Sequence, residues 1–169
     1  MLVAFFLAIN LVLKRFLYIR LPLLMAKFSF SFVPVILCAI ILGTKYTILL
    51  EVLSDILGWL LFPRGVFFVG FTISAMLIGF IYGEMLYSCD NIISAKRLLP
   101  RFIISISLVA IFISLGLNTF WLFCIAKNVV RLEFPLKIIR QILLIPFKVI
   151  TMYYTVKFLE NKLNNIINE

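Results

Sequence analysis

Long apolar stretches separated by short polar ones dominate the sequence. They cover approximately residues 1–18, 28–42, 46–62, 66–87, 102–126 and 135–159. The stretches are continuously apolar and do not alternate with polar residues as the strands of membrane barrels do, so we expect helices rather than strands. A helix needs about 20 residues to cross the hydrocarbon core of a membrane. The pattern therefore predicts a bundle of six transmembrane helices.

Prolines and polar segments mark the boundaries of these predicted helices. Pro63-Arg64-Gly65 ends the third, and Pro135 suits the first turn of the sixth. Pro34 lies within the second, where we expect it to kink the helix. We interpret segments 19–27, 88–101 and 127–134 as loops and 160–169 as a polar tail.

The composition supports a membrane location. The chain is 64% hydrophobic and 14% charged, whereas soluble domains are about 45–50% apolar and about 25% charged. Six spans use most of the 169 residues, so we expect residues 1–169 to form a single integral membrane domain. The first apolar run lacks a preceding basic segment and a small-residue cleavage site, so we interpret it as a retained span.

Several kinds of chemistry are disfavoured by the residues that are missing. The chain has no His, and Cys38, Cys89 and Cys124 form no CxxC pair, so we interpret the cysteines as buried apolar residues. It also has no Gly-rich phosphate loop that would serve ATP hydrolysis. Without a nucleophile–base pair or a metal-ligand cluster, we expect a non-enzyme with no metal or cofactor.

Small residues recur at helical spacing in two of the predicted spans. Ala75, Gly79 and Gly83 follow one another every four residues in the fourth span, and Ala4 and Ala8 do so in the first. Small residues allow helices in lipid to approach closely. We interpret the stripe in the fourth span as an internal contact. The stripe in the first span fits either an internal contact or a partner protein.

The third span carries two ionisable residues, which are costly inside a membrane and usually functional. Glu51 and Asp55 lie one turn apart, and Trp59 and Phe62 are expected to continue the same face. Such a stripe fits the wall of a ligand pocket, since flat apolar rings adjoin a polar group. A proton relay and a buried ion pair with a basic residue of a neighbouring span remain alternatives.

Basic and aromatic residues are predicted to converge at one end of the bundle. Asn118 and Trp121 share a face late in the fifth span, and Lys137 and Arg140 share one early in the sixth. If successive loops alternate between the two sides of the membrane, one side gathers Arg15, Arg20, Lys27, Trp59, Arg64, Asn118, Trp121, Lys137 and Arg140. This combination suits a flat, anionic organic solute.

Two long segments resemble a known transporter family. They are SDILGWLLFPRGVFFVGFTISAMLIGFIYG at 54–83, and GLNTFWL at 116–122 followed by FPLKIIRQILLIPFKV at 134–149. KRFLYIRLP at 14–22 and KFSFSFVPV at 27–35 are also similar. All resemble the substrate-binding S components of energy-coupling-factor (ECF) vitamin transporters, in particular the folate branch.

The resemblance implies an all-α, six-helix S component of a bacterial cell membrane, with both termini in the cytoplasm. It implies that the vitamin binds near the outer face and that a transmembrane coupling protein and two ATP-binding subunits drive uptake. The coupling protein would dock on the small-residue face of the first helix, here Ala4 and Ala8. The alternatives are an S component for pantothenate, riboflavin or thiamine, or a membrane protein that does not transport.

For folate, we expect the pterin to lie among aromatic and polar side chains and the glutamate tail to meet cations. The expected pterin site consists of Asp55, Trp59, Phe62, Asn118 and Trp121. The expected tail site draws on Arg15, Arg20, Lys137 and Arg140.

The charge distribution conflicts with this orientation. The chain has 16 basic and seven acidic residues, a net charge of +9, and we favour anionic lipid or an anionic solute as its partner over nucleic acid. With cytoplasmic termini, nine basic residues fall on the outer side and six on the inner side, and Lys148 lies within a span. The positive-inside rule favours the opposite orientation, whereas an anionic ligand would explain the outer excess.

Overall fold

The computed structural model describes residues 1–15, 18–21, 26–63, 67–87, 95–125 and 127–167. Of these, the side chains of 18–21, 26–28, 127–134, 136 and 162–167 are not described. In chain order the elements are α1 (Leu2–Arg15), β1 (Tyr18–Leu21), β2 (Ala26–Ser29), α2 (Phe32–Leu42), α3 (Thr44–Leu61), α4 (Val69–Leu86), α5 (Ala95–Leu108), the π-helical η2 (Val109–Leu117), α6 (Asn118–Ile125) and α7 (Lys127–Ile167).

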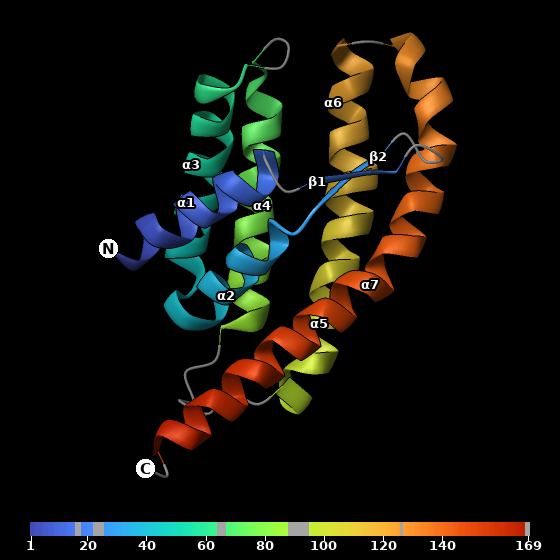
Figure 1. Ribbon diagram of the computed structural model, residues 1–169. Coiled ribbons are helices and arrows are strands. Elements are labelled where there is room, and N and C mark those ends of the chain that lie inside the picture. Colours follow the sequence, from blue (N-terminus) through green and yellow to red (C-terminus); the bar gives the residue numbers. More distant parts are fainter. Residues whose placement is uncertain (16–17, 22–25, 64–66, 88–94, 126, 168–169) are drawn as a thin grey trace.

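The helices form an all-α bundle, as the sequence predicts. Since α5, η2 and α6 follow one another without a break, the described residues contain six helical bodies. Figure 1 shows α3 beside α4, and α6 beside α7, while the short helices α1 and α2 cross the bundle. α3 and α6 end, and α4 and α7 begin, at the upper end of this view. We call this end the mouth.

Three segments of the described chain are long and apolar enough to cross a membrane, namely Val69–Leu86, Ala95–Ile125 and Lys137–Asn161. α2 is apolar but only 11 residues long, which corresponds to about 16 Å at the rise of an α-helix. Large apolar side chains are exposed on the outer faces of the helices, among them Ile73, Met76, Phe80, Ile104, Phe112, Ile142 and Phe158. Lipid is the solvent that such a surface requires.

The segment between α1 and α2, interpreted from the sequence as a loop at 19–27, contains two short strands. β1 and β2 pair antiparallel, with Tyr18 opposite Ser29 and Leu21 opposite Ala26. As a result, α2 begins at Phe32 rather than at residue 28. Pairing satisfies backbone N–H and C=O groups that an open loop would leave without partners. The apolar composition of this part of the sequence did not indicate the pairing of β1 with β2.

Proline positions also differ from the prediction. Pro34 is the third residue of α2, where no intrahelical donor is lost, so it does not kink the helix. Pro135 lies inside α7, because segment 127–134, expected to be a loop, is helical. Pro100 lies inside α5, which begins seven residues before the expected start at 102. At Pro100 and Pro135 the helix therefore extends beyond the apolar run.

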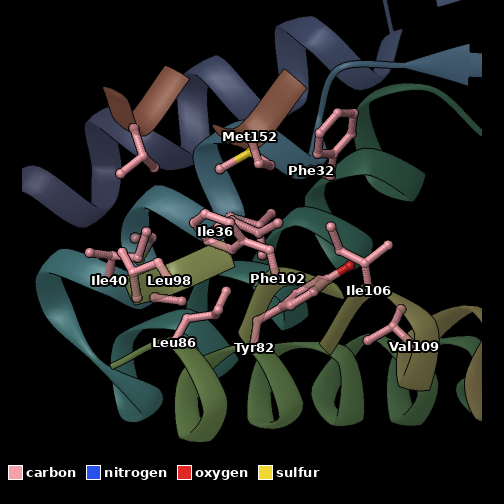
Figure 2. Close-up of a cluster of buried hydrophobic side chains, with 14 of the residues drawn as sticks. Phe32, Ile36, Ile40, Tyr82, Leu86, Leu98, Phe102, Ile106, Val109 and Met152 are labelled. Atoms are coloured by element: carbon pink, nitrogen blue, oxygen red, sulfur yellow. The ribbon is translucent and has the colours of Figure 1, made fainter. Parts of the chain in front are cut away.

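The apolar core joins α2, α4, α5, η2 and α7 (Figure 2). Its fully buried side chains include Ile36, Leu86, Phe102, Ile106 and Met152. Cys38 is buried in it as expected, whereas Cys124 is exposed and Cys89 lies outside the described residues. The core occupies the part of the bundle away from the mouth, so it fixes the helices without filling the predicted ligand site.

α4 packs directly against the backbone of α3 through its small-residue stripe. A Cβ atom on Gly79 would lie 2.7 Å from the Cα atom of Ile48 and 2.8 Å from the Thr47 carbonyl oxygen. One turn later, a Cβ atom on Gly83 would overlap Thr44, and Ala75 is buried as well. The prediction that this stripe is an internal helix contact is confirmed.

We predict that Gly79→Ala lowers the melting temperature of the purified protein in detergent. The new methyl group would meet backbone atoms of α3, which cannot rotate away, and overpacking of this kind costs about 1–3 kcal/mol. Gly116→Ala is the matched control, because the nearest atom to a Cβ there is the Ile111 oxygen at 3.6 Å. Equal melting temperatures for the two variants would contradict the close α3–α4 contact.

Candidate functional site

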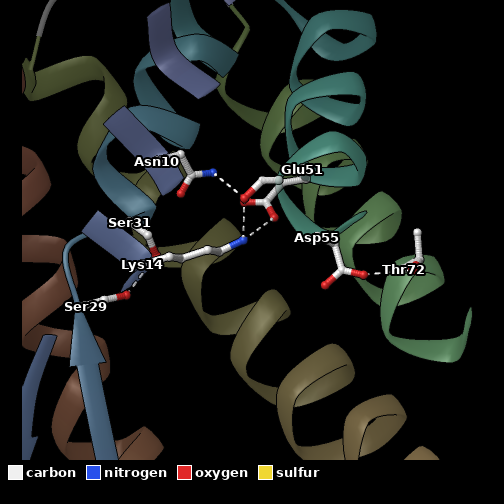
Figure 3. A network of polar contacts seen from close by, with 8 residues as sticks. Asn10, Lys14, Ser29, Ser31, Glu51, Asp55 and Thr72 are labelled. Carbon is white, nitrogen blue, oxygen red and sulfur yellow. Dashed lines mark hydrogen bonds and ion pairs between the residues drawn. The ribbon is translucent and has the colours of Figure 1, made fainter. Parts of the chain in front are cut away.

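A buried polar cluster connects α1 to α3 (Figure 3). Lys14 Nζ lies 3.4 Å from Glu51 Oε2 and donates a hydrogen bond to Ser54 Oγ at 3.0 Å. Asn10, which is fully buried, donates to the same hydroxyl at 3.3 Å. For Glu51, this confirms the alternative of an ion pair with a neighbouring span. The cluster fixes the rotation of α1, because all its α1 members must face α3.

Asp55 points toward α4 rather than toward α1. Its Oδ2 accepts a hydrogen bond from Thr72 Oγ1 at 2.8 Å (Figure 3). Among the described side chains Asp55 forms no ion pair, so a pairing with Arg140 is not found. The two carboxylates predicted to form one stripe thus have different partners. Asp55, which is only partly buried, remains the acidic group on the α4 side of α3.

The end of α3 meets the end of α1 at the mouth. An Arg15 Nη2 group donates to the carbonyl oxygen of Gly58, and the guanidinium lies 5.6 Å from the centre of the Phe62 ring. The expectation that Phe62 continues the face of Asp55 is wrong, because α3 ends at Leu61 and Phe62 has φ −139° and ψ 73°. Helical spacing no longer applies there, and Phe62 meets α1 instead.

A set of aromatic contacts joins α3, α4 and α6 at the mouth. The rings of Trp59 and Phe67 lie 5.2 Å apart, and those of Phe68 and Trp121 lie 5.6 Å apart. Trp121 Nε1 also donates to Ser74 Oγ at 3.2 Å. Gly70 makes this approach possible, because a Cβ atom there would lie 2.6 Å from the indole. Trp59 and Trp121, both predicted for the ligand site, therefore lie at the mouth, each in one of these two ring pairs.

The π-helical turns of η2 set the direction of α6. The backbone N–H of Asn118 reaches the Ile113 carbonyl oxygen, five residues earlier. Such wider turns are frequent at functional sites. Just beyond them, Asn118 Oδ1 and Thr119 Oγ1 are buried without a hydrogen-bond partner among the described residues. Buried acceptors without partners are rare and costly, so a ligand donor is a natural partner for them.

The N-terminal half of α7 supplies two further predicted cations, Lys137 and Arg140. Lys137 is buried, Arg140 is partly buried, and Gln141 beside them is 7% exposed. Gln141 Nε2 donates to Ser114 Oγ of η2, whereas its Oε1 has no partner among the described residues. Within the described part of the chain, no hydrogen bond or ion pair joins Arg140 to the residues of α1 or α3. Arg20 lies in β1, whose side chains are outside the described set.

Comparison with known proteins decides the family. A family model described as the substrate-specific component of ECF transporters matches residues 1–164. This chain belongs to that family. It is therefore a membrane transporter component and not an enzyme, as the sequence resemblance implies.

Individual relatives of this S component carry a more specific description. A protein of Clostridium novyi (strain NT) named folate transporter FolT is 29% identical over 89% of this chain and 83% of its own length. A protein of the same name from Leuconostoc mesenteroides is 31% identical over 72% of this chain and 61% of its own. A crystal structure titled FolT bound with folic acid superposes with a TM-score of 0.73 at 28% identity, covering 92% of this chain and 90% of its own.

Several residues of the candidate site in this S component were missed by sequence reasoning. Phe68, Thr72 and Ser74 line the start of α4, and Ser114 and Gln141 join η2 to α7. Only Gln141 carried a signal in the sequence, as a polar residue within an apolar run next to Arg140. Hydroxyl residues are common in membrane helices, so their pattern alone did not distinguish them.

The small residues of the first helix face outward. Ala4 and Ala8 are both exposed, and Phe5 and Val12 extend the same exposed surface of α1. Phe6 and Asn10 occupy the opposite, buried face. Of the two interpretations of this stripe, an internal contact is therefore wrong for the described structure. The outward position leaves the surface accessible to another helix.

We predict that Lys14→Met destabilises the S component, because it leaves the buried Glu51 carboxylate without its cation. Lys14 is 33% exposed and Glu51 8%, so the expected loss is roughly 1–3 kcal/mol, between the values of exposed and buried pairs. Chemical or thermal unfolding in detergent measures it.

The matched control is the double variant Lys14→Met/Glu51→Gln, which removes both charges. We expect it to recover part of the lost stability. If the double variant is less stable than Lys14→Met, the two charges do not stabilise each other and the ion pair has no role in holding α1.

Proposed function

We propose that this chain is a folate-binding S component that captures folate, or a reduced folate, on the outer side of the membrane. The observation that carries the proposal is its likeness to a structure titled FolT bound with folic acid, over 92% of this chain. The mouth supports the same ligand, since it combines tilted aromatic ring pairs, cations, and buried acceptors that have no partner among the described residues. Partner subunits with ATPase activity would then supply the energy for uptake.

The pterin would lie against the aromatic pair of Phe68 and Trp121. A pterin ring is flat and carries N–H donors, so it suits an indole face beside buried oxygen atoms. Asn118 Oδ1 and Gln141 Oε1 are such acceptors. The carboxylate of Asp55, which now accepts only a hydroxyl hydrogen bond among the described groups, is a third candidate. Trp59 and Phe62 would close the α3 side of the site.

The glutamate tail of folate would meet the basic residues of the mouth, namely Arg15, Arg20, Lys137 and Arg140. Arg140 is the strongest candidate, because a guanidinium matches the planar geometry of a carboxylate. Asp55 accepts a hydrogen bond from Thr72, and no ion pair joins Asp55 to Arg140 among the described side chains, so the guanidinium is not committed to that carboxylate. A ligand with two negative charges would also explain the excess of basic residues on the proposed outer side.

The proposed orientation has both termini in the cytoplasm and the mouth on the outside. Ala4 and Ala8 would then form the surface on which the helix of a transmembrane coupling protein docks. Their exposure and small size support this proposal, since small residues allow close helix approach in lipid. α1 would then take part in both partner docking and ligand binding, because Arg15 at its other end contributes to the mouth.

Calorimetry on the purified chain alone is the experiment that tests folate binding. We expect saturable binding of folic acid without ATP or partner subunits, since every residue of the proposed pocket belongs to this chain. Pantothenate, riboflavin and thiamine form the comparison panel. Tighter binding of any of these, or no binding of folic acid by a folded sample, would contradict the assignment.

Calorimetry on variants distinguishes the residues that bind the pterin from those that bind the glutamate tail. Arg140→Ala should weaken folic acid about ten- to a hundredfold, as expected for loss of a charge-assisted hydrogen bond. It should barely affect an analogue without the glutamyl carboxylates. Trp121→Ala should weaken both ligands. Arg101→Ala is the control, because Arg101 is exposed on α5 at the opposite end of the bundle. Equal losses for both ligands in Arg140→Ala would exclude it from the tail site.

For the docking surface, we predict that Ala8→Leu abolishes most uptake in cells while folic acid still binds the purified chain. The larger side chain would keep the coupling helix from approaching α1 closely. Ala8→Ser is the matched control and should retain uptake, because serine is nearly as small. Co-purification of the coupling protein with each variant tests whether the loss of uptake results from lost docking. Normal assembly with Ala4→Leu and Ala8→Leu would refute the proposed surface.

A further inference from the structure

At the end of the bundle opposite the mouth, α5 begins beside α7 (Figure 1), and residues of these two helices line a groove. It encloses about 350 Å³ and is lined by Lys96, Leu99, Val149, Ile150, Tyr153 and Tyr154. A more open hollow of about 650 Å³ adjoins it at Tyr154 and is lined also by Thr155, Lys157, Phe158 and Asn161. None of these residues belongs to the proposed folate or docking sites.

The groove has basic residues at the membrane surface and apolar residues farther into the membrane. Lys96 is the second residue of the candidate span Ala95–Ile125, and Lys157 lies near the end of the candidate span Lys137–Asn161. The two cations therefore lie at the same membrane surface. Val149 and Ile150 precede Lys157 on α7 by about two turns, which is about 10–12 Å along the helix axis, away from this membrane surface. Cations at the surface and an apolar floor below match the order of groups in a lipid.

The walls of the groove are held in place by specific contacts. Glu160 Oε2 accepts a hydrogen bond from the backbone N–H of Ala95 at 3.0 Å, which ties the first turn of α5 to α7. Lys157 Nζ lies 5.9 Å from the centre of the Tyr153 ring. Neither Lys96 nor Lys157 forms an ion pair with a described side chain. Lys96 and Lys157 thus flank an already formed apolar groove, and the nearby Glu160 carboxylate bonds to the α5 backbone without forming an ion pair with either lysine among the described side chains.

We propose that this groove binds one anionic phospholipid, such as phosphatidylglycerol. The phosphate lies between Lys96 and Lys157, and an acyl chain lies along Leu99, Val149 and Ile150. Basic pockets between transmembrane helices attract anionic head groups, and the partly buried ring of Tyr153 and the exposed ring of Tyr154 suit the interface between head groups and chains. A zwitterionic lipid fits the apolar floor equally but gains less from the two cations.

Native mass spectrometry of the full-length protein tests this proposal. The protein is released from nanodiscs that contain equal amounts of phosphatidylglycerol and phosphatidylcholine with identical chains, and the bound lipids are counted. We expect the wild type to retain phosphatidylglycerol preferentially. Lys96→Gln and Lys157→Gln should each reduce that preference about fivefold, which corresponds to about 1 kcal/mol for each basic residue at an anionic surface.

Lys45→Gln is the matched control, because Lys45 is exposed at the start of α3 and does not line the groove. It should leave the lipid preference unchanged. Equal retention of the two lipids by the wild type, retention of neither, or an equal loss of preference in Lys45→Gln would overturn the proposal. Lys96 and Lys157 are both exposed, so their substitution should leave the melting temperature unchanged.

Discussion

The close contact between α3 and α4 is the constraint on which the mouth depends. In lipid, apolar side chains gain little by packing against one another instead of against acyl chains, so helices associate where their backbones can approach closely. Gly79 and Gly83 provide that approach against Thr44 and Ile48. It holds the two helices side by side, and at their far ends Asp55 therefore meets Thr72, and Trp59 meets Phe67.

The mouth extends from this helix pair through contacts of a different kind. On one side, the polar cluster of Lys14 and Glu51 holds α1 against α3 and places Arg15 beside Phe62. On the other, Gly70 lets Trp121 of α6 approach α4 and bond to Ser74. Polar contacts between membrane helices are directional, so they fix helix rotation as well as distance. Rotation decides which side chains face a ligand.

α1 has two faces with separate tasks in the proposed function. Its buried face carries Asn10 and Lys14, and its exposed face carries Ala4 and Ala8. Since both faces belong to one short rigid helix, any movement of Arg15 at the mouth displaces the exposed surface as well. The groove between α5 and α7 lies at the opposite end of the bundle, so lipid binding there leaves both surfaces free.

The sequence alone determined the membrane class, the six helical bodies and the internal stripe of Ala75, Gly79 and Gly83, because these follow from run length, composition and spacing along one chain. It also identified Trp121 and Arg15 as residues of the mouth. The tertiary structure alone decided that Glu51 pairs with Lys14 while Asp55 meets Thr72, and that Phe62 turns toward α1. It also showed the β1–β2 hairpin and the π-helical turns before Asn118. These features depend on which helix lies opposite and where a helix ends, and periodicity within one segment carries no information about its neighbour.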